Sequence, residues 1–109
     1  MHSNLIVARM DISSTAEVAK LFGEFDQTGM PHHMGTLRRR LFSYRGLYFH
    51  LQDFAQDDGG ERIEASREDP RFMKICYDLQ PFIQPLDPAT WRRPADAMAT
   101  CFYDWSASS

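Results

Sequence analysis

The chain has 109 residues, of which 43% are hydrophobic and 13% aromatic, and its formal charge is −3. This length supports one packed core rather than two, so we expect a single domain over residues 1–109, and the apolar content excludes a disordered chain. The small negative charge argues against a nucleic-acid-binding protein, which needs a concentrated basic surface. Cys76 and Cys101 lie far apart, in no metal-binding or redox spacing, and we expect two buried, reduced thiols.

The N-terminal segment has four consecutive apolar residues, at positions 5–8, and no positively charged leading region. It is too short for a secretion signal or a membrane span, so we expect a soluble cytoplasmic protein with no membrane partner. Residues 5–10 are predicted to form a short buried strand.

A helix is predicted after this strand. Ser14 and Glu17 have the spacing of a capping box, in which each side chain hydrogen-bonds to the backbone of the other. Gly29 and Pro31 are expected to stop the helix. The apolar residues between these signals repeat at helical spacing and form one stripe: Val18, Leu21, Phe22 and Phe25.

Two β-rich runs, 36–44 and 47–54, follow on either side of Arg45 and Gly46. A glycine in a two-residue loop supplies the positive φ that a tight turn needs, so these runs predict a β-hairpin. Its expected pairs are Tyr44 with Leu47, Ser43 with Tyr48, Leu41 with His50, Arg39 with Gln52, and Leu37 with Phe54.

Residues 57–60 are predicted to be a loop before a helical region with a break at Asp69 and Pro70, where Asp can cap and Pro fits the first turn. Prolines interrupt residues 82–91, which we interpret as a connector, and residues 97–105 are predicted to form the last strand. The helix after the break carries a second apolar stripe: Phe72, Ile75, Cys76 and Leu79.

The resulting order, β-α-β-β-α-β, predicts an α+β, ferredoxin-like fold, with a four-stranded antiparallel sheet and both helices on one face. The other face would carry exposed aromatic and apolar side chains. Because large exposed apolar faces are rare on monomers, this face predicts that two chains associate.

Alternation along the hairpin places Arg39, His50 and Gln52 on one face, and Arg38 and Arg40 on the other. Arg39 and His50 are diagonal neighbours, within reach of long side chains. Two interpretations stay open. Under the helices, this face would bury an arginine and a histidine and would need a functional cavity. On a solvated or dimer-facing surface, the pair would carry no chemistry.

Asp26 lies near the C-terminal end of the predicted first helix, where the helix dipole disfavours a carboxylate and would suit it to proton transfer. An exposed aspartate without function is the alternative. Three histidines, His32, His33 and His50, are candidate metal ligands, but adjacent loop residues rarely point the same way, so we predict no metal. The sequence has no Gly-rich phosphate loop and no Gly-x-Ser-x-Gly elbow, so nucleotide-dependent and serine-hydrolase chemistry lack support.

Several segments together resemble the tetracenomycin-type aromatic polyketide cyclase family. They are residues 5–11, 35–40, 47–51, 69–72 and 102–105. Residues 48–54 and 87–91 look most like the angucycline branch, whose cyclases close the last ring of an angular four-ring skeleton. Spore-pigment cyclases of the same family are also similar.

The resemblance implies a cofactor-free homodimer of the dimeric α/β-barrel type that acts on a partly cyclised poly-β-ketone bound between sheet and helices. Transient contact with type II polyketide synthase components is implied as well. The family's catalytic positions correspond to Asp26, Arg39 and His50. The side chains expected to contact substrate are Phe25, Tyr48, Gln52 and Phe54.

One departure concerns Phe25, which stands where a tetracenomycin-type cyclase has a histidine before the aspartate. A mechanism that needs that histidine does not carry over. The expected reaction is an intramolecular aldol condensation with dehydration, with His50 or Asp26 as general base and Arg39 stabilising the enolate or the aldol oxyanion. The alternatives are a cofactor-independent monooxygenase and a non-catalytic subunit that shapes the product within the synthase.

Overall fold

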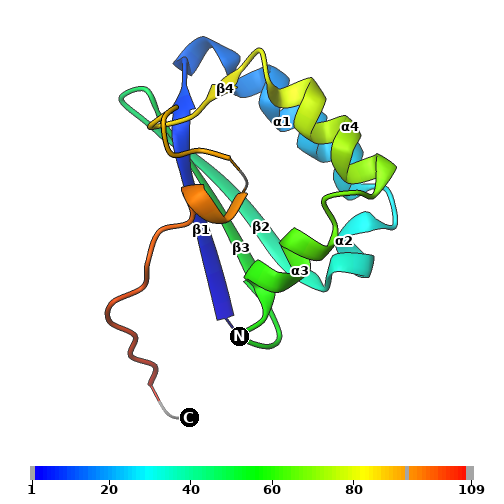
Figure 1. Cartoon of the computed structure of the whole chain (residues 1–109), viewed down its shortest axis with the longest axis vertical. Coiled ribbons are helices and arrows are strands. Elements are labelled where there is room, and N and C mark those ends of the chain that lie inside the picture. The colour runs from blue at the N-terminus through cyan, green and yellow to red at the C-terminus, as the bar shows by residue number, and fades with distance from the viewer. Residues whose placement is uncertain (1, 93, 108–109) are drawn as a thin grey trace.

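The computed structural model describes residues 2–92 and 94–107. Its strands form one antiparallel sheet in the order β2-β3-β1-β4, which is the predicted ferredoxin-like arrangement (Figure 1). The strands are β1 (His2–Met10), β2 (Thr36–Tyr44), β3 (Leu47–Phe54) and β4 (Ile83–Gln84). The helices are α1 (Thr15–Asp26), α2 (Met30–Met34), α3 (Gly59–Ala65) and α4 (Pro70–Leu79), with short 3-10 helices η1 (Ile12–Ser14) and η2 (Pro94–Ala97).

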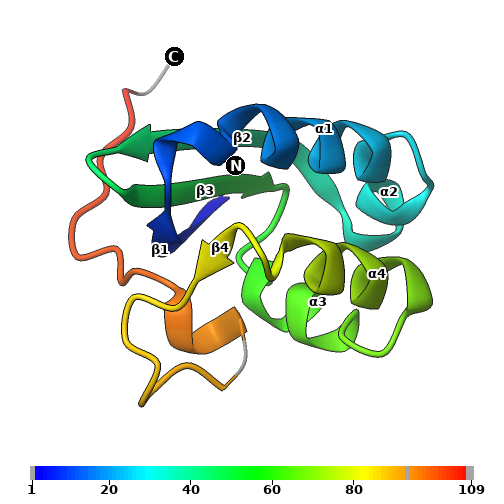
Figure 2. The ribbon, with the colours of Figure 1, turned by 90° about the horizontal axis from the view of Figure 1, so that it is seen from above.

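The helices lie on the same side of the sheet (Figures 1 and 2). Helix α1 packs beside α4, while α2 contacts β2 and α3 contacts β1. The face of the sheet under these helices, here called the inner face, therefore contributes the core. The opposite, outer face is less covered, and Phe42 and Tyr44 are exposed on it. No helix in the described part of the chain is both long and apolar enough to cross a bilayer.

Helix α1 begins where the sequence predicts, but it ends at Asp26, before the predicted stop at Gly29 and Pro31, and Pro31 instead lies in the first turn of α2, which was not predicted. The predicted capping box of α1 is also wrong. Ser14 makes no side-chain capping hydrogen bond. Instead Asp11 accepts a hydrogen bond from the backbone N–H of Ser13 and caps η1, which leads directly into α1. The reason is that the extra 3-10 turn places Ser14 in a helical conformation rather than the extended one that a capping side chain prefers.

The hairpin turn is confirmed, since Arg45 and Gly46 both have positive φ, 49° and 82°. The predicted pairs are also confirmed from Tyr44 with Leu47 to Arg39 with Gln52. The pairing of Leu37 with Phe54 is wrong, because the register shifts between Thr36 and Arg38. An extra residue in β2 leaves Leu37 unpaired and exposed, so Thr36 takes its place opposite Phe54.

The helical region breaks at Asp69 as predicted, and the Asp69 carboxylate caps α4 by accepting a hydrogen bond from the backbone N–H of Arg71 at 2.9 Å. The predicted loop at residues 57–60 is shorter than expected, because α3 already begins at Gly59. A Cβ at Gly59 would lie 2.3 Å from Cδ2 of Phe54. Glycine is therefore what lets α3 approach the sheet so closely.

The predicted last strand at residues 97–105 is wrong. The fourth strand is β4, within the predicted connector, and it pairs with Arg9 and Met10 of β1. Beyond η2, Met98 makes a single bridge to Ile6, and the backbone N–H of Ala99 donates to the carbonyl of Leu5 at 2.7 Å. Residues 100–107 then run away from the body as an extended tail (Figure 1). Beside β1, β4 pairs with Arg9 and Met10 and Met98 bridges to Ile6, and the residues that follow leave the sheet.

Both cysteines are free and exposed, so the expectation of buried thiols is also wrong. Cys101 belongs to the tail, which has no core to enter. Cys76 follows the buried Ile75 on α4 but is exposed, because that helix buries a narrower stripe than its sequence suggests.

Candidate active site

The inner face of the hairpin lies under the helices, so Arg39 and His50 are buried rather than on a solvated surface. On β3, Tyr48, His50 and Gln52 are all buried, and His50 is only 6% exposed. The Arg39 side chain opposite them is 7% exposed. Buried polar groups need hydrogen-bond partners within the protein, so the contacts of these side chains define the site.

Arg39 on β2 joins the last residue of α1 to the middle of β3. Its Nε donates to both carboxylate oxygens of Asp26, at 3.0 and 3.1 Å. Its Nη1 lies 2.7 Å from Nε2 of His50. Its Nη2 is ion-paired with Asp26 at 2.9 Å but lacks hydrogen-bond geometry, so it is a buried donor without a hydrogen-bond acceptor among the described residues. The structure thus brings Asp26, Arg39 and His50 together as predicted.

Aromatic rings enclose this polar cluster from the α1 side. The guanidinium carbon of Arg39 lies 5.0 Å from the ring centroid of Phe22 and 5.5 Å from that of Phe25. The rings of Phe22 and His50 are 5.0 Å apart in an edge-on arrangement. Cation–π contacts stabilise a charge that has lost part of its hydration, so the rings help to hold Arg39 in the interior.

Burial sets the protonation of the neighbouring groups on β3. It lowers the pKa of His50 to about 3, and the positive charge of Arg39 adds to the effect. Burial also raises the pKa of Tyr48 well above its usual value, with Arg39 opposing the change. Near neutral pH the site therefore contains a neutral imidazole, a neutral phenol and a fixed guanidinium charge.

Asp26 differs from its two partners in exposure, because its side chain is 39% exposed. It lies at the C-terminal end of α1, as predicted from the sequence. Its carboxylate is turned to Arg39 and connects the buried guanidinium to the surface. The arrangement is one that can stabilise a negative oxygen, because a fixed cation in a dry site interacts strongly with developing charge.

The expected substrate contacts lie at different depths. Phe25 and Tyr48 border the Arg39 cluster. Gln52 is buried and accepts a hydrogen bond from Thr36 at 3.4 Å. Phe54 is only 1% exposed and packs closely under Gly59, so it supports the core beneath α3.

Two neighbours of the cluster, Phe22 and Thr36, were missed as site residues. Phe22 belongs to the predicted apolar stripe of α1, one turn before Asp26, and that spacing was a usable signal. Thr36 faces Gln52 only because of the register shift in β2, which no sequence pattern indicated.

His32 and His33 lie on α2, and both are exposed. Among residues 2–92 and 94–107, no three His, Cys, Asp or Glu side chains gather as metal ligands would. A surface hollow of about 290 Å³ is lined by residues including Val7, Trp91 and Met98, and by none of the Arg39 cluster. Arg39 and His50 themselves are nearly closed to bulk water in the single chain.

Known proteins give an independent comparison. A family model described as polyketide synthesis cyclase matches residues 2–106. An uncharacterized protein of Streptomyces coelicolor is 42% identical over 106 residues, covering 96% of this chain and 95% of that protein. The polyketide synthase CurG of Streptomyces cyaneus is 38% identical over 105 residues, covering 96% of this chain and 97% of that protein.

The tetracenomycin F2 cyclase of Streptomyces glaucescens is 36% identical over 103 residues, covering 94% of this chain and 93% of that protein. A solved structure of that cyclase, described as a type II polyketide cyclase, matches with a TM-score of 0.91 and 34% identity, covering 99% of this chain and 100% of the other. The likeness therefore extends over sequence and fold alike.

Proposed function

The chain belongs to the polyketide synthesis cyclase family and is an enzyme of that kind, and we propose that it closes a late ring of an aromatic polyketide. The substrate would be a partly cyclised poly-β-ketone from a type II synthase. The ring would be the fourth, in an angular skeleton of angucycline type. The angular assignment rests on the sequence resemblance of residues 48–54 and 87–91.

The proposed reaction is an intramolecular aldol condensation followed by dehydration. A methylene between two carbonyls loses a proton, its carbon forms a bond to a second carbonyl carbon, and the resulting alkoxide is protonated. Loss of water then gives the ring double bond. Because these steps exchange only protons and water, atoms and electrons balance without an oxidant, a reductant or a cofactor.

The observation that carries this proposal is the buried guanidinium of Arg39, held between Asp26 and His50 with one donor lacking a hydrogen-bond acceptor among the described residues. Both the enolate and the aldol alkoxide place negative charge on oxygen. A fixed donor in a dry site stabilises such charge, and losing one typically costs about 10²–10³-fold in rate. Arg39 would therefore stabilise the oxyanion.

Proton transfer would fall to Asp26 or His50, since a positioned general base typically contributes about 10²–10⁴-fold. Phe25, Tyr48 and Gln52 would hold the flat substrate so that one carbon meets one carbonyl. Poly-β-ketones cyclise spontaneously, so this positioning would decide which ring forms as well as how fast.

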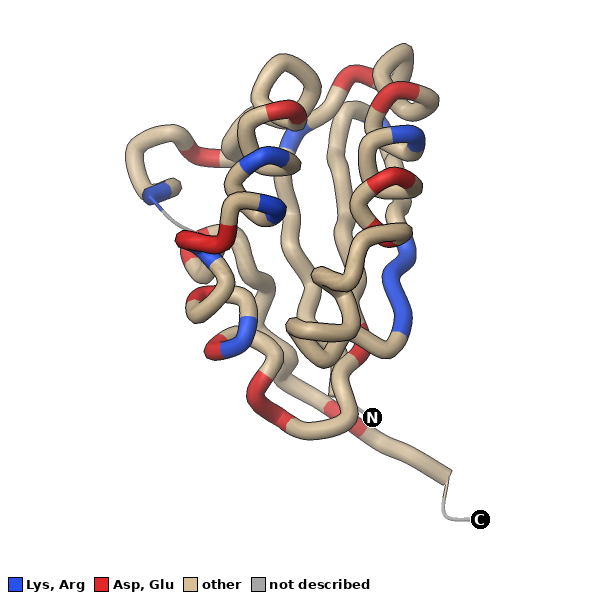
Figure 3. Tube along the Cα trace, turned by 90° about the vertical axis from the view of Figure 1, so that its right-hand side faces the viewer, with Lys and Arg blue, Asp and Glu red and all other residues tan. Residues whose placement is uncertain are grey.

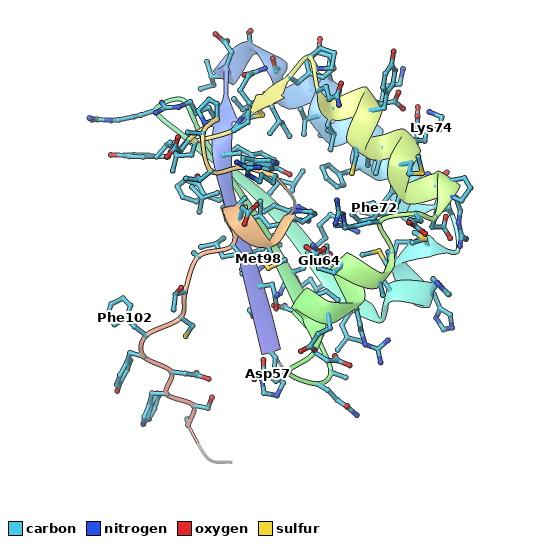
Figure 4. All side chains as sticks on the ribbon, in the orientation of Figure 1. Asp57, Glu64, Phe72, Lys74, Met98 and Phe102 are labelled. Carbon is cyan, nitrogen blue, oxygen red and sulfur yellow. The ribbon has the colours of Figure 1, made fainter. Side chains whose placement is uncertain are left out.

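A homodimer is part of the proposal. On the outer face Phe42 and Tyr44 are exposed, and in the tail Phe102, Tyr103 and Trp105 are exposed as well. Figure 4 shows Phe102 standing clear of the folded body. Apolar surface of this kind favours association, and a second copy of the chain would cover it. Contacts with synthase components would be transient and would involve other surfaces.

Charge offers no support for a nucleic-acid partner. Acidic and basic positions are interspersed along the helices (Figure 3), rather than gathered in one basic strip. On β2, the run Arg38–Arg40 is divided between the two faces of the sheet, because Arg39 is buried on the inner face while its neighbours are exposed.

The test adds purified protein to a synthase, a ketoreductase and early cyclases, and identifies the product skeleton with and without oxygen. We expect an angular four-ring product that forms equally well under nitrogen. A linear product would overturn the angucycline assignment, and oxygen consumption would indicate a monooxygenase. No turnover of a released intermediate by the purified protein alone would indicate a subunit that only shapes the product.

A further inference from the structure

The short contact between Arg39 and His50 restricts which nitrogen of the imidazole can carry a proton. An arginine side chain stays protonated and has only donors, so Nη1 must donate across the 2.7 Å contact. Nε2 of His50 must then accept, and its lone pair is occupied. We propose that Arg39 holds His50 as the neutral tautomer protonated at Nδ1, so that His50 serves the site as a hydrogen-bond donor and not as its general base.

The surroundings of His50 favour the same state. Phe22 from α1 packs edge-on against its ring, and the ring of Tyr48 is 6.2 Å away. The charged and titratable groups near it are Arg39 on β2, Asp26 on α1 beyond Arg39, and Tyr48 on β3, with Cys76 of α4 near Tyr48. None of these places a carboxylate directly against the imidazole, so no neighbour favours a second proton on it.

The position of the Asp26 carboxylate also favours a neutral His50. Asp26 is bound to Arg39 rather than to His50, through the Nε and Nη2 groups. This differs from an arrangement in which a carboxylate orients a histidine and raises its basicity. Asp26 therefore positions the guanidinium, and the guanidinium in turn occupies the acceptor atom of the imidazole.

This inference deepens the proposed function and rests on it for its catalytic meaning. Of the two candidate bases, it leaves Asp26, with the enolate otherwise formed by proton loss to solvent. The guanidinium of Arg39 and the Nδ1–H group of His50 would then donate to different oxygens of the intermediate, because Nδ1 lies on the other side of the ring from the contact with Arg39. The ligand class is thus an anionic 1,3-dicarbonyl, held by donors rather than deprotonated by imidazole.

The tautomer can be read by nitrogen NMR on protein labelled with ¹⁵N at histidine, in which protonated and unprotonated ring nitrogens resonate in separate regions. We expect Nδ1 of His50 protonated and Nε2 unprotonated, unchanged between pH 5 and pH 8. The exposed His2, His32 and His33 supply reference signals for solvated rings in the same spectrum. A His50 ring protonated at Nε2, or one that gains a second proton in this range, would overturn the proposal.

Two variants separate the tautomer from general folding effects. Arg39→Leu removes the donor, and the His50 ring nitrogens should then change their protonation pattern, while Arg38→Leu on the opposite face should leave it unchanged. If the pattern persists in a folded Arg39→Leu protein, Arg39 does not set it and the proposal fails. If Arg39→Leu does not fold, the wild-type spectrum alone decides the tautomer.

The cyclisation rates of two His50 variants distinguish a hydrogen-bond donor from a general base. His50→Gln keeps an N–H donor, so we expect it to retain roughly tenfold more cyclisation activity than His50→Ala, the value of about one hydrogen bond. Equal losses of about 10²–10⁴-fold in both variants would indicate a general base and overturn the proposal. Because the NMR measurement needs no substrate, it can fail or succeed independently of the proposed cyclase reaction.

Discussion

Replacing Arg39 with alanine tests how the site contributes to stability. The Asp26 side chain is 39% exposed and can be rehydrated in the variant, so losing the ion pair costs only about 0–1 kcal/mol. Nε2 of His50 cannot be rehydrated as easily, because His50 is 6% exposed, and losing the hydrogen bond there costs about 1–3 kcal/mol. With the lost packing on Phe22 and Phe25, the free energy of unfolding should fall by about 2–4 kcal/mol.

Arg38→Ala is the matched control, since Arg38 precedes Arg39 on the same strand but is exposed. Its free energy of unfolding should stay within about 0.5 kcal/mol of wild type. Both variants should be unfolded in urea at pH 7 and at one protein concentration, because association would shift the apparent stability. Equal losses in the two variants would refute the reasoning, since Arg39 would then contribute no more than a solvated arginine.

Three further predictions concern pH, packing and capping. Because burial lowers the pKa of folded His50 to about 3 from 6.5, its contribution to stability is complete above pH 6.5 and is lost as the pH falls toward 3, by at most about 1.4 kcal/mol per pH unit. Urea titrations at pH 7 and pH 5 should show this slope in wild type, and a His50→Gln protein with the same slope would contradict it. Gly59→Ala places a methyl group 2.3 Å from the Phe54 ring and should lower the free energy of thermal unfolding by about 1–3 kcal/mol. At Gly60 the nearest atom is 3.6 Å away, so Gly60→Ala should be neutral or stabilising. If Gly60→Ala were the more destabilising of the two, α3 would be able to move away from Phe54. Asp69→Ala removes the α4 cap and should cost about 1 kcal/mol, and an unchanged melting temperature would show that the cap is dispensable.

The hairpin was predictable because its signals are local. Arg45 and Gly46 mark a two-residue turn, and the strict alternation of a strand then places Arg39 and His50 on one face. The register shift near Thr36 was not predictable, because nothing in residues 36–38 distinguishes a regular strand from one with an extra residue. Its effect is confined to the far end of the hairpin, so the predicted pairing of Arg39 with Gln52 and of Leu41 with His50 is unaffected.

The prediction of the last strand was wrong because strand formation depends on the arrangement of the whole sheet, which a local sequence pattern does not show. Residues 97–105 have the aromatic content of a strand, but strand formation requires a partner edge, and partner edges are a property of the whole fold. Residues 83 and 84, between prolines, looked like a connector and instead took the place beside β1. The exposure of Cys76 also depends on the tertiary structure, because the rotation of α4 against the sheet decides which of its residues are buried.

The amino-acid sequence alone therefore determined the hairpin of β2 and β3, the face shared by Arg39 and His50, and the family to which the chain belongs. Local turn chemistry and the two-residue period of a strand are enough for the first two. Only the tertiary structure decided that this face is buried under α1, that Asp26 reaches Arg39 rather than His50, and that Nη1 of Arg39 lies 2.7 Å from Nε2 of His50. These features depend on the distance between a helix end and a sheet, which packing sets and sequence spacing does not.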